Sequence, residues 1–512
     1  MLNATDLESL SEPQLRDATR DLLDTVEALK NEVLFKSTRI EQLTYELARY
    51  KRLRFDRASE KLDRTQASLL EEALDEDLCA LEEELEQLQP TPAPKREKAK
   101  PRREHLPEHL PRVPVHHEPE STTCACGCQM NRIGEDVAEK LHYIPGDFTV
   151  ERHIRGKWVC GKCEKLVQAP VPAQVIDKGV ATPSLLAQVM VSKYADHVPL
   201  YRQEEIFGRV GYAIPRSTLG EWVGVCGVRL QPLVDALRGI VLGHRVLHAD
   251  ETPVAMLKPG IGKTHRAYLW AYSPGAFEDI KAVIYDFTET RSGKNAQEFL
   301  GAWRGKLVCD DYSGYKALFA GDGVIECGCL AHARRKFFDL HAANKSQIAE
   351  DALKLFGQIY DVEREVQELD AQARREVRQA KAKPIADALH AWMIAHRQKV
   401  PDGSATAKAI NYSLTRWQAL TRYLDDGTLP PDNNYIENRI RPIALGRSNW
   451  LFAGSLRAGQ RAAAIMSLIQ SARMNGIDPY AYLKDVFERL PTLQGSRIEE
   501  LQPHRWAPAV KN

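Results

Sequence analysis

An acidic pair interrupts an apolar run at Val246–Val254, which reads VLHADETPV. Apolar and β-branched residues flank the pair on both sides, so we expect a buried β-strand here. A carboxylate in the middle of such a strand is unfavourable unless its charge is neutralised. Taken alone, the pattern favours a strand that ends in an acidic turn. The carboxylates further along the chain decide between the two interpretations.

The segments after this stretch alternate in a regular way. Strands are predicted over 266–272, 281–287, 306–309 and 324–327, with helices over 295–303, near Tyr315 and from Ala331. Three consecutive strands followed by alternating helices and strands indicate a mixed α/β sheet. Asp250 lies on the first strand, and Asp310 with Asp311 comes at the end of the fourth. Each strand thus carries an acidic residue in unusual surroundings.

A third acidic residue follows a long helical stretch. Residues 331–429 are rich in Arg, Lys and Gln with few strand formers, which predicts a helical insertion. The sequence PPDNN at 430–434 then breaks the chain, and Asn433 or Asn434 can cap the helix that contains Glu437. Glu437 and Arg441 are four residues apart and share a helix face, so for Glu437 alone a surface ion pair remains an alternative.

Two segments have the composition of a DNA contact. Arginines interleaved with an aromatic residue suit a phosphate backbone. Such a run follows Glu437 and consists of Arg439, Arg441, Arg447, Arg457 and Arg461, with Trp450 among them. Upstream, residues 176–240 resemble a helix-turn-helix whose second helix opens with Arg216, Ser217 and Thr218, positioned to touch DNA. An ordinary α-hairpin would give the same pattern.

Two groups of cysteines predict a structural zinc site. Cys124, Cys126 and Cys128 are followed by Cys160 and Cys163. Four thiolates complete a tetrahedral zinc shell and supply folding energy that so small a unit lacks. Four of these five cysteines are needed. The second pair is well spaced, whereas in the first group either Cys124 or Cys128 accompanies Cys126.

The N-terminal arm carries two heptad seams. Leu15, Leu22, Leu29 and Leu43 mark the first, with β-branched residues on the alternate positions. This pattern is typical of a parallel coiled coil, so we expect a homodimer or higher oligomer. The shorter seam from Leu74 to Leu88 fits equally well a helix that packs on its own protein. Residues 90–119 are a basic, Pro-rich linker and should be extended and mobile.

Length and charge limit the class of protein. A chain of 512 residues predicts three or more domains, and the equal totals of 70 Lys+Arg and 70 Asp+Glu favour no partner by net charge. No apolar run has the length of a membrane span, and no signal peptide is evident. We therefore expect a cytoplasmic, nucleoid-associated protein without a membrane partner.

Several motifs resemble a known family. They are HADETP at 248–253, CDDYSGY at 309–315, NNYIEN at 433–438 and GRSNWLF at 446–452. Together they look like the transposases of insertion-sequence family sixty-six, of the TnpC type. The resemblance implies a DDE recombinase that cleaves and joins DNA at terminal inverted repeats and in target DNA. It also implies small accessory proteins of the same element.

The resemblance implies a role for each acidic residue. Asp250, Asp310 and Glu437 would hold Mg²⁺ (or Mn²⁺) at the catalytic site. The family pattern selects Asp310 over Asp311, although Asp311 stands where the family often has Gly. Glu251 has no assigned role. His248 and His332 are expected to be structural or to lie near DNA rather than to bind metal.

The predicted fold class is a multidomain α+β chain. It comprises a coiled-coil arm (1–89), the linker (90–119), a zinc-knuckle module (120–175), a helical DNA-binding segment (176–240), a ribonuclease H-like catalytic core (241–330 and 430–475), the helical insertion (331–429) and a C-terminal segment (476–512). A non-catalytic DNA-binding regulator, with structural acidic residues, is the alternative function. A metal-dependent nuclease without strand transfer would share the same site.

Overall fold

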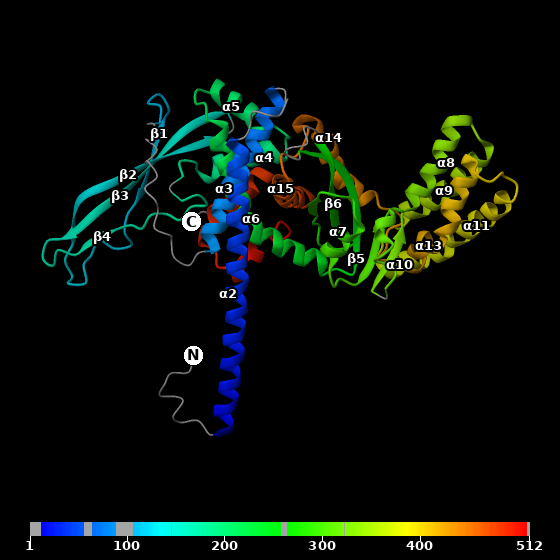
Figure 1. Ribbon diagram of the computed structural model, residues 1–512, viewed down its shortest axis with the longest axis horizontal. Coiled ribbons are helices and arrows are strands. Elements are labelled where there is room, and N and C mark those ends of the chain that lie inside the picture. The colour runs from blue at the N-terminus through cyan, green and yellow to red at the C-terminus, as the bar shows by residue number, and fades with distance from the viewer. Residues whose placement is uncertain are drawn as a thin grey trace.

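The computed structural model describes residues 12–55, 64–88, 106–144, 146–177, 179–257, 264–321 and 323–508 (Figure 1). A central α/β body has a β-rich module on one side and an all-helical body on the other, and a long helix projects away from it. Within the described residues, no helix combines the length and apolar character that a membrane span requires.

The central sheet has five strands. They are β5 (Val246–Leu257), β6 (Thr264–Pro274), β7 (Ile284–Thr288), β8 (Gly305–Cys309) and β9 (Val324–Gly328), in the order β7-β6-β5-β8-β9. β6 runs antiparallel to both β5 and β7, whereas β8 and β9 continue the sheet in parallel on the other side of β5. The prediction of a mixed α/β sheet is confirmed. The helix expected near Tyr315 is only a short 3₁₀ turn, Ser313–Tyr315.

Helices from distant parts of the chain cover the sheet. α6 (Arg216–Leu242), α14 (Asn434–Trp450), α15 (Leu456–Met474) and α16 (Pro479–Arg489) surround a core that includes the fully buried Trp270 and Tyr272. α7 (Gly293–Leu300) precedes β8. Because β7 is an edge strand, its outward N–H groups need acceptors. The hydroxyl of Ser467 on α15 accepts from the N–H of Tyr285 at 2.8 Å, and that of Ser471 accepts from Val283, just before the strand, at 3.0 Å.

The β-rich module is a second sheet. Its strands are β1 (Arg112–His117), β2 (Met130–Ile144), β3 (Asp147–Cys160) and β4 (Leu166–Gln168), with β1 and β2 on either side of β3. β1 falls inside the segment 90–119, so the prediction of a wholly mobile linker is wrong for these residues. The reason is local, because Leu106 and Leu110 bury their side chains ahead of the strand and fix its start.

The N-terminal arm has two helices, α2 (Glu12–Phe55) and α3 (Arg64–Leu88). Leu74, Leu78 and Leu81 of the second seam are buried where α3 packs along α6. A side chain at Gly224 of α6 would collide with the backbone of Glu76, which shows how closely the two helices approach. The second seam therefore docks on its own protein, the alternative left open by the sequence.

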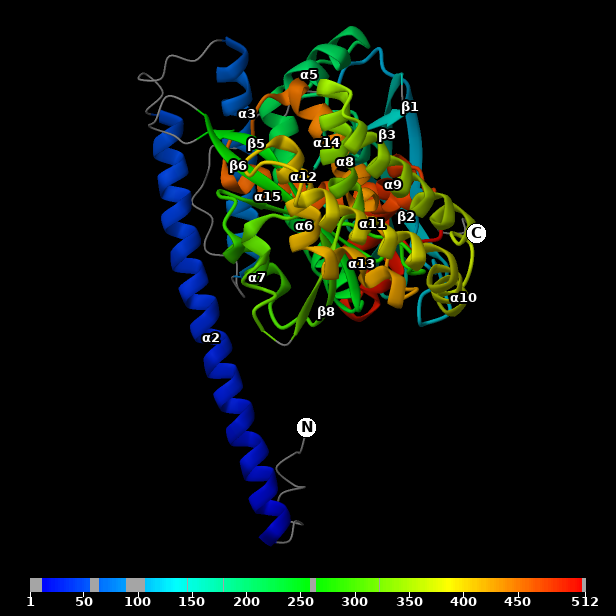
Figure 2. The same cartoon turned by 90° about the vertical axis from the view of Figure 1, so that its right-hand side faces the viewer.

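The first seam lies on the projecting helix α2 (Figure 2). Along it, Leu22, Leu29 and Val33 are more than half exposed, at 56%, 54% and 66%. Leu43 is fully buried, because the end of α2 lies along α3. The side chain of Leu15 lies outside the described residues. A single chain thus leaves most of this apolar seam uncovered.

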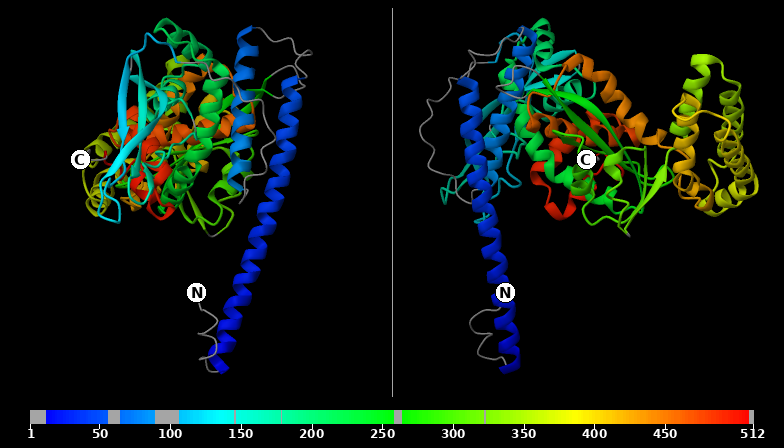
Figure 3. Two further views of the ribbon diagram at one scale, coloured as in Figure 1. Left: turned by 90° about the vertical axis from the view of Figure 1, so that its left-hand side faces the viewer. Right: turned by 45° about the vertical axis from the view of Figure 1, so that its right-hand side comes forward.

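The predicted insertion is helical throughout its elements. It comprises α8 (Leu330–Asn344), α9 (Gln347–Glu365), α10 (Ala371–Val377), α11 (Lys383–Arg397), α12 (Ala405–Thr415) and α13 (Trp417–Asp425). A separate core joins Phe337 and Phe356 of this body to Val308 and Cys327 at the β8–β9 side of the sheet. The helical body therefore packs beside the β8–β9 side of the sheet (Figure 3).

Candidate active site and metal centre

The register of the sheet brings Asp250 and Asp310 together. β5 pairs in parallel with β8 through His248 and Val308. Asp250 lies two residues after His248, still within β5. Asp310 lies two residues after Val308, just beyond the end of β8. Because side chains alternate across a strand, residues two positions on point to the same face as the paired residues. Both carboxylates therefore lie on one face at the centre of the sheet.

A buried clamp brings α14 and Glu437 to the same place. The Asn433 side chain donates from Nδ2 to the carbonyl oxygen of Ala249 at 2.9 Å, and its Oδ1 accepts from Nδ1 of His248 at 2.7 Å. His248 and Asn433 are both fully buried. The clamp fixes the residue before α14 to β5, and Glu437 lies in the first turn of that helix.

The clamp also corrects a prediction. Asn433 occupies the N-cap position of α14, but its side chain makes no capping hydrogen bond. Its amide is used to hold β5 instead. A side-chain hydrogen bond at the start of α14 comes from Asp432, whose Oδ1 accepts from the backbone N–H of Asn434 at 3.1 Å.

Mutual repulsion among carboxylates marks the site. Burial raises the pKa of Asp250 well above its ordinary value, and the negative charges of Glu251, Asp310 and Glu437 raise it further. Among the described residues, no lysine or arginine forms an ion pair with Asp250, Asp310 or Glu437. The Oε1 atom of Glu437 is buried and has no hydrogen-bond partner. Such a cluster favours a cation that neutralises it.

Glu251 lies next to this cluster, and its side chain has a structural role that the sequence did not reveal. Its side chain is 1% exposed and pairs with Arg291, whose Nε lies 2.7 Å from Oε1. The hydroxyl of Tyr315 donates to its other oxygen at 3.0 Å. Glu251 therefore anchors the loop after β7 and the turn after β8 to the central strand.

Asp311 is also held by other residues. Arg416, at the start of α13, places its Nε 3.4 Å from Asp311 and also pairs with Glu326. Asp310 instead accepts a hydrogen bond on Oδ1 from the backbone N–H of Tyr312 at 2.9 Å. The charge of Asp310 is among the main causes that raise the pKa of Asp250. Asp310 thus lies with Asp250, whereas Asp311 is paired with Arg416, and the catalytic role of Asp310 stays a prediction.

A mixed group of potential ligands lies beside Glu437. Nδ1 of His332 on α8 is 3.7 Å from Oε1 of Glu437, and with Cys329 the three ligand atoms lie within 4.8 Å of one another. However, the Cys329 sulfur already accepts a hydrogen bond from the backbone N–H of Asn433 at 3.2 Å. Burial raises the pKa of this thiol to about 12, which opposes the thiolate that a metal needs.

The predicted DNA contacts differ in exposure. Ser217 is exposed, and Arg216 and Thr218 are half-buried at the start of α6, whose remainder is largely buried. On α14, Arg441 is exposed, whereas Arg447 donates to the carbonyl oxygen of Pro253 at 2.6 Å. Arg439 lies over the ring of Tyr435 at 4.8 Å, and Trp450 packs against the main core. A role in DNA binding stays a prediction for all seven residues.

Two arginines of the same basic run are not available to DNA. Nη2 of Arg461 lies 2.7 Å from Glu76 and 3.0 Å from Asp77 of α3, and the residue is 8% exposed. Arg457 pairs with Glu84 of the same helix at 2.5 Å. Their assignment to a phosphate contact is wrong, because α3 supplies carboxylates that the local sequence could not reveal.

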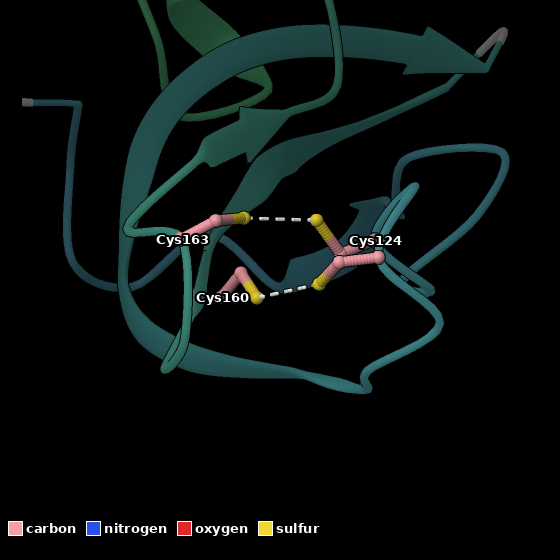
Figure 4. Close-up of side chains that lie close together, drawn as sticks. Cys124, Cys160 and Cys163 are labelled. Atoms are coloured by element: carbon pink, nitrogen blue, oxygen red, sulfur yellow. Dashed lines mark hydrogen bonds between the residues drawn. The ribbon is translucent and has the colours of Figure 1, made fainter.

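The cysteine cluster is assembled by a long hairpin. β2 and β3 pair from Met130 with Cys160 to Ile144 with Asp147, so the segments before β2 and after β3 meet at the open end. There Cys124, Cys126, Cys160 and Cys163 form one group. The sulfur atoms of Cys124 and Cys163 are 3.1 Å apart (Figure 4), and those of Cys126 and Cys160 are 3.7 Å apart.

This arrangement fits zinc. Thiolates around one zinc ion are separated by about 3.8 Å, given Zn–S bonds of about 2.3 Å in a tetrahedron. Backbone N–H groups of Cys163 and Lys162 lower the pKa of the Cys160 thiol to about 6, which favours the thiolate. Cys128 is not in the group, so the structure resolves the ambiguity of the first knuckle in favour of Cys124.

Comparison with protein families gives matches along most of the chain. The model described as "Transposase IS66 family" matches residues 178–461, which is more than half of the chain. The "IS66 C-terminal element" matches 467–504, the "zinc-finger binding domain of transposase IS66" matches 121–164, and "Transposase C of IS166 homeodomain" matches 42–115. The zinc-finger match and the four-cysteine group together support structural zinc.

Similar proteins occur in Sinorhizobium fredii (strain NBRC 101917 / NGR234), where they are described as uncharacterized. One, y4jD, is 38% identical over 418 residues, which are 78% of this chain and 81% of its own length. A second, y4qI, is 39% identical over 78% of this chain and 76% of its own length. A third, y4hP, is 34% identical over 80% and 77%. The likeness thus extends over most of each protein.

Proposed function

The chain belongs to the IS66 transposase family, and from this premise we propose that it cleaves and joins DNA at the ends of an insertion sequence. Asp250, Asp310 and Glu437 are the proposed catalytic carboxylates. The observation that carries the proposal is their convergence from the central strand, the end of its parallel neighbour and the clamped helix α14.

The topology of the sheet supports a ribonuclease H-like core. Three antiparallel strands in sequence, followed by two parallel strands added beside the first, give the observed order β7-β6-β5-β8-β9. This arrangement places the first and fourth strands side by side, as the catalytic geometry of such a core requires. In this proposal, residues 241–330 and 430–475 build the site jointly, with 331–429 inserted between the second and third acidic residues.

The residues present fit Mg²⁺ or Mn²⁺ as the catalytic metal. All three proposed ligands offer carboxylate oxygens, which hard divalent cations prefer. The raised pKa of Asp250 and the unpartnered Oε1 of Glu437 both indicate a place for positive charge. When bound, such ions activate an attacking water or 3′-hydroxyl and stabilise the leaving oxygen.

The surrounding residues keep the carboxylates in place. Asn433 and His248 fix the start of α14 to β5, so the position of Glu437 relative to Asp250 does not depend on a flexible loop. On the opposite side, Glu251 with Arg291 and Tyr315 braces the turn that carries Asp310. Buried supporting contacts of this kind hold catalytic groups in a productive geometry.

The partners follow from the same proposal. Arg216, Ser217, Thr218, Arg439, Arg441, Arg447 and Trp450 are the proposed DNA contacts, for terminal inverted repeats and for target DNA. The uncovered seam of α2 supports self-association through a coiled coil, and small accessory proteins of the element are proposed partners. DNA binding would associate the protein with the nucleoid.

A cleavage assay tests the function. The full chain is incubated with duplex DNA that carries an end of its element, with Mg²⁺ or with a chelator, and nicked and joined products are separated. We expect Mg²⁺-dependent cleavage and joining, both abolished by Asp250→Ala, Asp310→Ala or Glu437→Ala, while gel-shift binding persists. Binding without cleavage would instead identify a regulator, and cleavage without joining a nuclease.

A further inference from the structure

A groove of about 470 Å³ runs between two helices of the insertion, and its lining includes none of the proposed catalytic carboxylates. Its lining comprises Ala331, Arg334, Arg335 and Phe338 on α8, Gly357, Tyr360, Asp361 and Arg364 on α9, and Asn434 at the start of α14. The spacing on each of the two long helices is i, i+3, i+4, i+7, which is one continuous helix face. Lys345 and Ser346 connect α8 to α9, so the two faces line one groove from opposite sides.

The groove is positively charged. Arg334 and Arg335 are exposed and form no ion pair with any of the described residues. Arg364 is the third cation, and it pairs with Asp361, the single lining carboxylate. Two cationic side chains therefore remain without a counter-ion from the groove itself, which suits a phosphate-bearing ligand.

An exposed aromatic ring lies among these charges. Phe338 is 52% exposed, although large aromatic side chains are normally buried where the fold allows it. It stands one helical turn after Arg334, on the same face. An exposed ring next to unpaired arginines is the combination with which proteins hold unpaired nucleic acid bases.

Gly357 leaves the α9 side of the groove without a side chain at that position. It lies within α9, where glycine disfavours the helix, and a Cβ at this position would meet nothing within 4 Å. Packing inside the protein therefore does not require glycine here. A glycine in open space on the groove wall instead lets a ligand approach the helix backbone closely.

The groove leads to the proposed catalytic carboxylates. Asn434 lies three residues before Glu437 on α14. The hydroxyl of Tyr360 in the groove donates to Asp432 at 2.9 Å, in the segment that positions α14. On α8, His332 lies next to the groove residue Ala331 and 3.7 Å from Glu437. A strand that passes the carboxylates can thus continue into the groove.

We propose that this groove binds an unpaired nucleotide of the DNA strand next to the scissile phosphate. Phe338 stacks on the base, Arg334 and Arg335 contact the phosphates, and Gly357 leaves room for the sugar. The inference rests on the proposed function, because it assumes that DNA is cut at the adjacent carboxylates. It assigns the insertion a direct part in holding the substrate.

Binding of DNA with a fluorescent base tests the proposal. The full chain is titrated into end DNA that carries aminopurine beside the cleavage position, in a fully paired duplex and in one with that base unpaired. We expect tighter binding and quenching with the unpaired base. Phe338→Ala should abolish the quenching and, with loss of stacking, weaken this binding about tenfold or more. Joint replacement of Arg334 and Arg335 by Ala should weaken binding and reduce its salt dependence.

Gly357→Met provides a test that misfolding cannot imitate. The side chain would fill the groove while improving helix propensity, so we expect weaker binding of the unpaired base together with unchanged or higher thermal stability. Ile394→Ala and Lys399→Ala are the matched controls. They change an apolar residue that is 44% exposed and an exposed cation, both in the insertion but outside the groove.

The outcomes separate this proposal from the proposed function. Wild-type binding and quenching in Phe338→Ala and Gly357→Met, or equal affinity for paired and unpaired DNA in the wild type, would overturn the groove proposal even if the chain cleaves DNA. Loss of unpaired-base binding in these variants would support the groove as a nucleotide site. That support would stand even for a wild-type chain that failed to cleave, in which case the proposed function alone would fall.

Discussion

Nδ1 of His248 donates a hydrogen bond of 2.7 Å to Oδ1 of Asn433, a residue 185 positions further along the chain. The orientation of the amide is fixed, because its Nδ2 donates to the carbonyl oxygen of Ala249. Burial lowers the pKa of His248 to about 4, so the imidazole is neutral at physiological pH. One buried pair thereby sets the relation between the strand that carries Asp250 and the helix that carries Glu437.

Asn433→Ala should separate these two elements. It removes the hydrogen-bond partner of His248 Nδ1 and the contact of Asn433 with the Ala249 carbonyl, so we expect the free energy of unfolding to fall by about 1–3 kcal/mol. Cleavage should fall by about 10–100-fold, as is typical when a supporting contact of a metal ligand is lost. Denaturant unfolding and the cleavage assay measure the two effects. Asn438→Ala, an exposed residue of the same helix, should leave stability unchanged. Equal stability of the two variants would contradict the clamp.

Asp250→Asn should stabilise the metal-free protein at neutral pH. The folded-state pKa of Asp250 is raised, so its contribution to stability is full below its ordinary value of about 3.9 and is lost as pH rises through the raised pKa. Asparagine has no charge to lose. We therefore expect a gain on the order of 1 kcal/mol at neutral pH in a chelator, which disappears below about pH 3.9. Thermal unfolding across pH measures it.

With Mg²⁺ present, the wild type should instead be more stable than Asp250→Asn. A cation that binds only the folded site stabilises the wild type but not Asp250→Asn. Asp311→Asn serves as the control, because it removes an ion pair with Arg416 and offers no gain in the chelator. A wild-type protein that is more stable than Asp250→Asn without metal would show that the three carboxylates do not repel one another.

Zinc content should distinguish Cys124 from Cys128. Cys124→Ser removes a member of the four-sulfur group, so we expect the loss of the bound zinc and increased protease sensitivity of the β2–β3 hairpin. Cys128→Ser should retain the zinc, since its sulfur lies outside the group. Elemental analysis of the purified variants gives the result. Zinc loss in Cys128→Ser with retention in Cys124→Ser would reverse the assignment.

Arg461→Leu should release α3 from the core. The substitution leaves the buried carboxylates of Glu76 and Asp77 without this partner, and breaking such a pair destabilises by about 3–5 kcal/mol. Protease cleavage within 64–88 should become rapid. Arg505→Leu breaks an exposed pair with Glu499 and should change stability by less than about 1 kcal/mol. Similar effects of both substitutions would mean that α3 is not held by this network.

The sequence predicted the elements around the candidate site well. Strand periodicity identified the five strands of the sheet, and the order of three strands before the alternation gave its mixed character. The long helical stretch after Ala331 was recognisable from composition. These features are local or depend on neighbouring segments, so one sequence suffices to find them.

Contacts between distant segments were not predictable in the same way. In the sequence, Arg461 is one of a run of arginines that suits a phosphate contact. Only the packing of α3 shows that it pairs with Glu76 and Asp77. The sequence around Asn433 predicts a helix cap, but the side-chain amide instead hydrogen-bonds His248 on β5. The segment from Leu106 to β1 reads as a linker because two leucines among prolines and charges carry no periodicity.

Glu251 and Asp311 show the same limit. Each stands beside a proposed catalytic residue, and adjacent acidic residues cannot be ranked from composition. Their partners are Arg291 with Tyr315 for Glu251 and Arg416 for Asp311, which lie 40 or more positions away. These partners are what separates the structural carboxylates from the proposed catalytic ones.

The most direct measurement compares Asp310→Asn with Asp311→Asn in Mg²⁺-dependent cleavage of element-end DNA. The two residues are neighbours of equal charge, so the loss of one negative charge should change DNA affinity similarly in both variants. We predict that Asp310→Asn reduces cleavage to background while Asp311→Asn retains it. Full cleavage by Asp310→Asn would contradict the assignment of Asp250, Asp310 and Glu437 as the catalytic carboxylates.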